Sequence, residues 1–199
     1  MKATDYEPGD TPMRTAILGA ALTVTAALAS TTPPAHATTT TAAVTATQPI
    51  LVATCTATLT GGYATPLDPG STNAQQPDTL SETGSVTCVD DAGQPLIRGT
   101  MTRTTVLPTA QCSGIAYNDP STTHITWSDG TTTNLTLDQA NAIAVLGATA
   151  TTGTGAATTD STKFTGDTID AAVMATGPGC GTQAGQTQVD ATIVFTLAH

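Results

Sequence analysis

The chain has 199 residues, of which 15 are acidic and 5 are basic, and its formal net charge at pH 7 is −10. Such an acidic chain lacks the cations that neutralise a nucleic-acid backbone or bind an anionic lipid surface. The composition therefore argues against nucleic-acid binding, and against membrane attachment once a leader has been removed. Its length fits one domain, and its charge favours a soluble monomer.

The N-terminal residues have the layout of a secretory signal peptide. Arg14 precedes an apolar run over residues 16–29 that is too short to span a membrane, and the cleavage-site pattern Ala35-His36-Ala37 follows. We expect residues 1–37 to be removed and the protein to be secreted; an uncleaved anchor is the alternative. Because the residues before Met13 are acidic where a leader is normally basic, we expect translation to start at Met13.

The remainder of the chain divides into two parts by composition. Residues 38–50 are rich in threonine and predict a flexible N-terminal segment, in which Thr38 to Thr41 are candidates for O-linked sugar. In residues 51–199 the threonines alternate with apolar residues. We therefore expect a folded domain over 51–199.

Period-2 alternation of apolar and polar residues predicts β-strands with one buried face. The pattern is clearest over residues 53–59 and 189–197, where threonine, a β-branched residue, fills most of the polar positions. It places Phe195 inward. Further strands are expected near Thr83–Cys88, Ile97–Val106, Gly114–Tyr117 and Thr168–Met174.

A hairpin is expected where Ser128-Asp129-Gly130 separates two alternating segments, because glycine adopts the positive φ of a tight turn. Trp127, just before this turn, is expected to point inward. The segment Leu137–Thr149 allows two interpretations. It is either a short helix capped by Asp138 and stopped at Gly147, or a strand buried on both faces, which its neighbours favour.

Eight or nine short strands without a convincing helix predict an all-β fold, an antiparallel two-sheet β-sandwich. An immunoglobulin domain packs a buried tryptophan against a disulfide. Here that pattern would have to run Cys112–Trp127–Cys180, so the predicted sandwich is only loosely immunoglobulin-like.

The four cysteines predict two disulfides, because an even number in an exported domain indicates a disulfide framework. Three pairings are possible. Cys55 lies near the start of the first strand and Cys88 at the end of the next, and two antiparallel neighbours bring those ends together. This favours Cys55–Cys88 and Cys112–Cys180. The absence of a C-x-x-C motif argues against a zinc site.

A serine-hydrolase triad is suggested by His124, which has Ser121, Ser128 and Asp129 nearby in the sequence. Residues so close along a hairpin point to alternating faces and cannot form the required relay. We therefore expect His124 to be an ordinary surface histidine.

Two acidic pairs, Asp90-Asp91 and Asp167 with Asp170, are candidates for calcium binding or for glycoside cleavage. Neither has calcium-ligand spacing, Asp90-Asp91 fits a turn, and Asp167 and Asp170 would face opposite ways on one strand. We therefore predict no catalytic, cofactor-binding or metal-binding residues.

Carbohydrate binding on a sheet needs exposed aromatic side chains, and the predicted domain offers only Tyr63 and Tyr117 once the inward aromatics are set aside. Asn134-Leu135-Thr136 matches the N-glycosylation sequon, in the return strand of the hairpin. These features leave a cell-surface glycan or protein as a possible partner.

Several short motifs resemble those of the small secreted β-sandwich proteins of actinobacteria. The resemblance covers roughly residues 55–197 and implies a sandwich with a strand near Ile143, but it implies no activity. The motifs that carry it are Cys55-Thr56-Ala57-Thr58, Gly84-Ser85-Val86-Thr87-Cys88, Ile125-Thr126-Trp127-Ser128-Asp129-Gly130-Thr131-Thr132 and Phe164-Thr165-Gly166-Asp167.

Because no polar constellation of catalytic type is visible, the sequence favours a non-enzymatic extracellular module, either structural or ligand-binding. The alternatives are a secreted hydrolase or carbohydrate-active protein that uses an acidic pair, and a calcium-stabilised adhesion domain.

Overall fold

The computed structural model describes residues 50–71, 74–116 and 119–199, which form nine β-strands and one short 3₁₀ turn. The predicted leader, the start at Met13 and residues 38–49 lie outside the described residues. The elements are β1 (Leu51–Leu67), η1 (Pro69–Ser71), β2 (Gln76–Val89), β3 (Pro95–Ala110), β4 (Gly114–Ala116), β5 (Asp119–Trp127), β6 (Thr132–Val145), β7 (Ala148–Ala157), β8 (Thr168–Thr176) and β9 (Gln186–Ala198).

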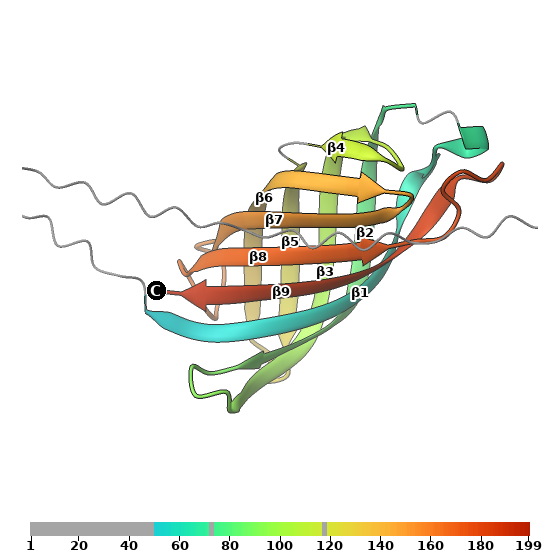
Figure 1. Ribbon diagram of the computed structural model, residues 1–199. Helices are drawn as coiled ribbons and strands as arrows, with labels where there is room; N and C mark the ends of the chain where they lie inside the picture. The colour runs from blue at the N-terminus through green and yellow to red at the C-terminus, as the bar shows by residue number, and fades with distance from the viewer. Residues whose placement is uncertain (1–49, 72–73, 117–118) are drawn as a thin grey trace, which may run out of the picture. The chain divides into compact units, whose positions relative to one another are not determined.

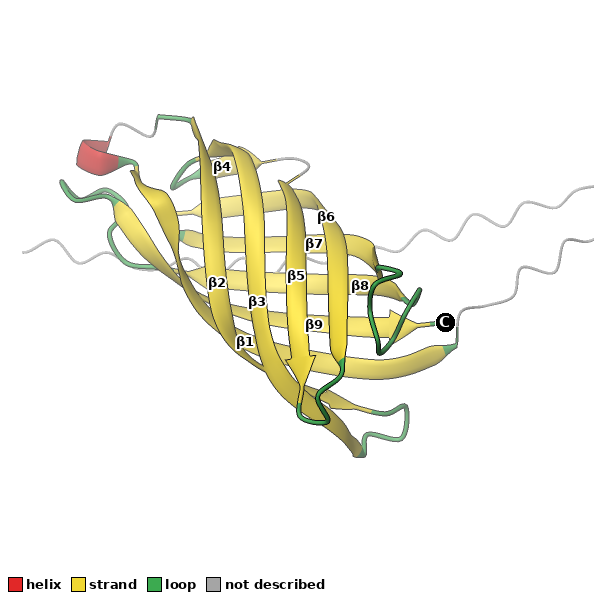
Figure 2. Ribbon diagram, turned by 180° about the vertical axis from the view of Figure 1, so that it is seen from behind, coloured by secondary structure: helices red, strands yellow, loops and turns green. Residues whose placement is uncertain are grey.

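The strands form one antiparallel sheet that closes on itself. Around the ring the order is β1-β2-β3-β5-β6-β7-β8-β9, and β9 pairs with β1. Figures 1 and 2 show the resulting eight-stranded barrel from opposite sides. The ninth strand, β4, precedes β5 in the chain and pairs with the last residues of β6.

The predicted two-sheet sandwich is therefore wrong, although the all-β class and the two disulfides are confirmed. Alternation shows which face of a strand is buried, and that face is the same in a sandwich and in a barrel. The pairing of β9 with β1, which sets Phe195 opposite Cys55, decides between the two folds. That pairing joins the two ends of the domain and leaves no signature in either strand.

Inward-facing glycines let the strands coil tightly enough to close. A Cβ atom on Gly84 would lie 2.0 Å from the Thr58 carbonyl oxygen, and one on Gly155 would lie 1.9 Å from the Thr136 carbonyl oxygen. A side chain at either position would collide with the backbone of the neighbouring strand. Glycine thus allows the close backbone approach that a strongly curved sheet requires.

The segment Leu137–Thr149 is a strand, a turn and a second strand. β6 ends at Val145, Leu146 and Gly147 take φ values of 49° and 82°, and β7 starts at Ala148. Two successive positive φ angles are typical of a type I′ hairpin turn. The helical interpretation is wrong, and so is burial on both faces, since Ile143 and Val145 are exposed.

Most of the other expected elements are present. The hairpin around Ser128-Asp129-Gly130 joins β5 to β6, and the described residues of the strands expected from alternation lie in β1, β2, β3, β4, β8 and β9. Trp127 and Phe195 point inward, each 2% exposed. The sequence did not resolve β7 as a strand of its own.

One end of the barrel interior, here called the tryptophan end, is densely packed and apolar. Trp127 meets Phe164 edge-on, with ring centroids 5.6 Å apart, and the Cys55–Cys88 disulfide is buried in the same cluster. Phe164 belongs to the β7–β8 loop, which is bonded back to the barrel through the Lys163 N–H and the Thr132 carbonyl at 3.0 Å. This end holds the main hydrophobic core.

Candidate functional site

The opposite end of the interior, here called the cavity end, contains a cavity of about 70 Å³. It lies where the β1–β2, β3–β4, β6–β7 and β8–β9 connections meet. Leu80, Leu107, Ala142 and Val173 supply apolar wall. A space of this size holds a few water molecules or a small organic group, and eight-stranded barrels are wide enough to enclose one small ligand.

Four polar side chains from four neighbouring strands also line this cavity. They are Glu82 on β2, Arg103 on β3, Asp119 on β5 and Gln139 on β6. Each residue is only 2% to 5% exposed. All four occupy inward positions of the alternating strands, so the fold directs charged and amide groups into the barrel.

Glu82 and Arg103 are directly opposite each other in the β2–β3 pairing, and Arg103 Nη1 lies 3.0 Å from Glu82 Oε2. On β1, the other strand that pairs with β2, Gly61 lies opposite Glu82. A Cβ atom on Gly61 would lie 2.7 Å from Glu82 Cγ. Glycine at 61 thus leaves room for the Glu82 side chain. The ion pair is close, but its geometry is not that of a well-aligned hydrogen bond.

Several buried polar atoms have no hydrogen-bond partner within the described part of the chain. They include both carboxylate oxygens of Glu82, Oδ1 of Asp119 and Nε2 of Gln139. The hydroxyls of Thr105, Ser121 and Thr123 share this property. Leaving one such group unsatisfied costs about 1–3 kcal/mol, and most buried polar groups in proteins are paired. This concentration is therefore unusual for an interior that serves folding alone.

Burial shifts the ionisation of these groups. It raises the pKa of Asp119 to about 6, against the opposing effect of the Arg103 cation. It also raises the pKa of Glu82, again opposed by Arg103, and lowers the pKa of Arg103, opposed mainly by Glu82. Desolvation, helped by the nearby Glu82 and Asp78 carboxylates, raises the pKa of Tyr63 to about 12. One guanidinium thus lies among two carboxylates in a poorly solvated space.

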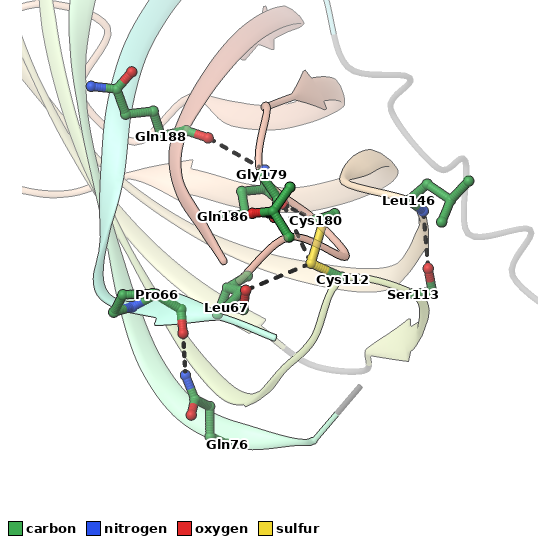
Figure 3. Close-up of a disulfide and its surroundings, with 11 residues drawn as sticks. Pro66, Leu67, Gln76, Cys112, Ser113, Leu146, Gly179, Cys180, Gln186 and Gln188 are labelled. Carbon is green, nitrogen blue, oxygen red and sulfur yellow. Dashed lines mark hydrogen bonds between the residues drawn. A yellow bond between two sulfur atoms is a disulfide. The ribbon is translucent and has the colours of Figure 1, made fainter. Parts of the chain in front are cut away.

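The Cys112–Cys180 disulfide ties loops together at the cavity end. Cys112 follows β3 and Cys180 precedes β9, so the bond links connections from opposite walls: β3 and β8 are separated by three strands either way around the ring. Figure 3 shows the surroundings, where Gln186 Oε1 lies 2.9 Å from Cys180 Sγ. A disulfide sulfur carries no proton, so this is a polar contact and not a hydrogen bond.

The β6–β7 turn joins the same cluster of loops. The Gly147 N–H donates to the Cys112 carbonyl at 3.0 Å, and the Leu146 N–H donates to Ser113 Oγ at 2.9 Å. The disulfide and these bonds fix the loops that border the cavity. The two disulfides are the pairs that the topological argument favoured.

The structure keeps the residues of the suspected triad apart. Ser121 faces the interior at 3% exposure, whereas His124 is on the outer surface, where its Nδ1 lies 2.6 Å from Asn134 Oδ1. The Asn134 amide also donates to Asp160 Oδ2 at 2.9 Å, so the nitrogen of the sequon is engaged in a hydrogen bond. Asp129 lies in the β5–β6 turn and accepts from the Thr131 N–H.

The predicted acidic pairs are also not brought together as sites. Asp90 Oδ1 accepts from the Gln94 N–H at 2.7 Å, which makes it a turn residue. Asp167 is buried and lies 2.8 Å from His199 Nδ1, while Asp170 is exposed on β8. No group of three or more metal-ligating side chains is found among the described residues.

The cavity residues were missed, but the sequence carried a signal for two of them. Glu82 stands in phase with Leu80, Val86 and Cys88 on the buried face of β2. Arg103 stands in phase with Met101 in the same way on β3. A charged residue in phase with the buried apolar residues of a strand indicates that the interior has a role beyond folding. Tyr63, expected only as a surface aromatic, also lines the cavity, and Tyr117 lies outside the described residues.

Comparison with protein-family models, curated proteins and solved structures finds no match to this chain. Within the residues that the structure describes, no helix has the length and apolar character needed to cross a membrane.

Proposed function

We propose that this protein binds a small ligand in the cavity end of the barrel. The observation that carries the proposal is the cavity itself, lined by buried polar atoms that lack partners in the described chain. Ligand sites in proteins are concave and mostly apolar, with a few placed polar groups that fix orientation. The interior around Glu82, Arg103, Asp119 and Gln139 has this composition.

We place this activity outside the cell. Two disulfides are typical of extracellular proteins, and the leader pattern over residues 1–37 supports export. The motif resemblance to secreted actinobacterial proteins supports the same location. A secreted, non-enzymatic binding module therefore remains the proposal, with its site now assigned to the barrel interior.

A secreted hydrolase is the second candidate, because an aspartate with a pKa of about 6 suits a general acid. The pair would be Glu82 and Asp119, not the pairs expected from the sequence. A cavity of about 70 Å³ is too small for a polymer chain, which argues against glycan cleavage at this site. Release of nitrophenol from small nitrophenyl esters or glycosides, abolished in Asp119→Asn, would favour the hydrolase.

A fragment screen by two-dimensional NMR tests the binding proposal. Fragments of up to about eight heavy atoms should shift the amides of cavity residues such as Gln139 and Val173. Ala142→Leu, which fills the cavity, should abolish these shifts. The matched control is Ala172→Leu, on the exposed face of β8, which should leave them intact. If no fragment shifts the cavity amides, or if Ala142→Leu binds as the wild type does, the proposal is wrong.

A further inference from the structure

The polar lining of the cavity allows the chemical class of the ligand to be named. Resting on the proposed function, we propose that the ligand is a short aliphatic amine, bound as its ammonium ion against the acidic groups of the cavity, Asp119 and Glu82. Three features of the cavity point to this ligand: its charge balance, its unpaired donors and acceptors, and its apolar wall.

The charge balance of the cavity is negative. Arg103 is the cation that faces it, from β3, and the carboxylates of Glu82 on β2 and Asp119 on β5 face the same space. Tyr63, on β1, carries a phenol whose raised pKa of about 12 keeps it neutral at physiological pH. Asp78 lies nearby on β2, but its carboxylate accepts from the backbone N–H groups of residues 64, 65 and 79. With both acids ionised, one guanidinium leaves one negative charge uncompensated.

The unpartnered atoms are mainly acceptors. Among the described residues that line the cavity, three unpartnered carboxylate oxygens of Glu82 and Asp119 can only accept, Gln139 Nε2 can only donate, and the Thr105 hydroxyl can do either. Glu82 Oε2 also lies 3.0 Å from Arg103 Nη1, so the acceptors most open to a ligand are Glu82 Oε1 and Asp119 Oδ1. An ammonium group carries three donors and no acceptor, so it complements this set. A carboxylate ligand would instead add acceptors and a second uncompensated charge, which burial makes costly.

The apolar residues of the cavity wall determine which group the ligand can carry besides its ammonium head. Leu80, Leu107 and Val173 border the same space of about 70 Å³, so a short alkyl chain can be buried while its ammonium head meets the acids. The strong negative charge of the whole chain also attracts cations from solution. A butyl chain is therefore a suitable probe length.

Three probes of matched size separate the candidate chemistries: n-butylamine, butan-1-ol and sodium butanoate. NMR titration of the oxidised protein at pH 8 should give an affinity for butylamine about tenfold or more above that for butanol, with butanoate weakest. Asp119→Asn should lower butylamine affinity about tenfold and change butanol affinity less than about twofold. Glu82→Gln provides a second variant with the same expected direction. Asp170→Asn, on the outer face of β8, is the matched control and should change neither affinity.

The pH dependence gives an independent readout. Because the bound ammonium needs Asp119 ionised, butylamine affinity should fall by about tenfold per unit as pH drops below about 6, while butanol affinity stays level. Equal or tighter binding of butanol or butanoate overturns the amine assignment and leaves the binding function standing. Failure of all three probes overturns the assignment too, and the fragment screen then decides separately whether the cavity binds ligands at all.

Discussion

The two ends of the barrel interior are built from the same strands but differ in whether their buried polar groups are hydrogen-bonded. At the tryptophan end, Trp127 Nε1 donates to Thr133 Oγ1 at 2.8 Å, and Thr133 Oγ1 donates in turn to the Lys163 carbonyl at 2.8 Å. At the cavity end, the carboxylates of Glu82 and Asp119 carry oxygens with no such partner in the described chain.

The means of closing each end differ as well. The β7–β8 loop covers the tryptophan end with backbone hydrogen bonds and the Phe164 ring, whereas a covalent bond between Cys112 and Cys180 holds the loops of the cavity end. The tryptophan end, which is apolar and has its polar groups hydrogen-bonded, stabilises the fold through burial. Buried charged groups at the cavity end cost stability, so their presence indicates a role other than folding. This difference supports the proposal that one end serves folding and the other serves binding.

Removing the disulfides tests this assignment with the largest expected effect. The loop-entropy model gives about 4 kcal/mol for either bond, since the separations are 33 residues for Cys55–Cys88 and 68 for Cys112–Cys180. The paired alanine variants should thus be destabilised alike in urea titrations. Only loss of Cys112–Cys180 should also weaken ligand binding. Equal loss of binding in both variants would contradict the division between the ends.

The second prediction concerns Asp119 and the pH dependence of stability. Burial raises its pKa in the folded protein to about 6, above the ordinary value of 3.8, so the folded state holds the proton more tightly than the unfolded state. Ionising it therefore costs stability, progressively between about pH 4 and pH 6, and the cost persists above that window.

Asp119→Asn should accordingly match the ligand-free wild type near pH 4 and exceed its stability by about 3 kcal/mol at pH 7. Chemical denaturation across this pH range measures the difference. Asp170→Asn, at an exposed position, is the control and should show no such trend. A constant difference between Asp119→Asn and the wild type at all pH values would mean that Asp119 is not held in a poorly solvated site.

At the tryptophan end, loss of the indole is expected to lower stability without changing ligand affinity. Trp127→Phe removes the Nε1–H donor to Thr133 and leaves a gap beside Phe164, at a cost of about 2 kcal/mol. Urea titration should show this loss, while ligand affinity should stay at the wild-type value. A fall in affinity of about tenfold would show that the tryptophan end shapes the cavity, and the separation of roles would fail.

Much of the barrel was predictable from local pattern, and much of the site was not. Alternation over residues 53–59 and 189–197 predicted the first and last strands, because burial of one face leaves a period of two in the sequence. It also placed Cys55 and Cys88 at meeting strand ends. Closure was not predictable, since it depends on a pairing between those distant strands.

The site was missed for a related reason. Asp119 lay beyond the strand expected near Gly114–Tyr117, and Glu82 lay just outside the strand expected from Thr83 onward. Arg103 was inside an expected strand, but its inward phase was not tested. These side chains meet only because closure brings their strands around one interior. A sandwich would have given no reason to expect a shared cavity.

The smallest expected effect belongs to the ion pair outside the tryptophan end. Lys163 Nζ lies 2.9 Å from Asp129 Oδ2, with both side chains partly exposed, and Lys163 also lies 5.8 Å from the centre of the Phe164 ring. Exposed pairs contribute little and are screened by salt, so Lys163→Met should shift the melting temperature by less than about 2 °C and leave ligand affinity unchanged. Calorimetry at low salt and again in 0.5 M NaCl, where the Debye length falls to about 4 Å, would check this. A large loss at low salt that disappears at high salt would mean that an ionic contact holds the β7–β8 loop, and the tryptophan end would then depend on charge as the cavity end does.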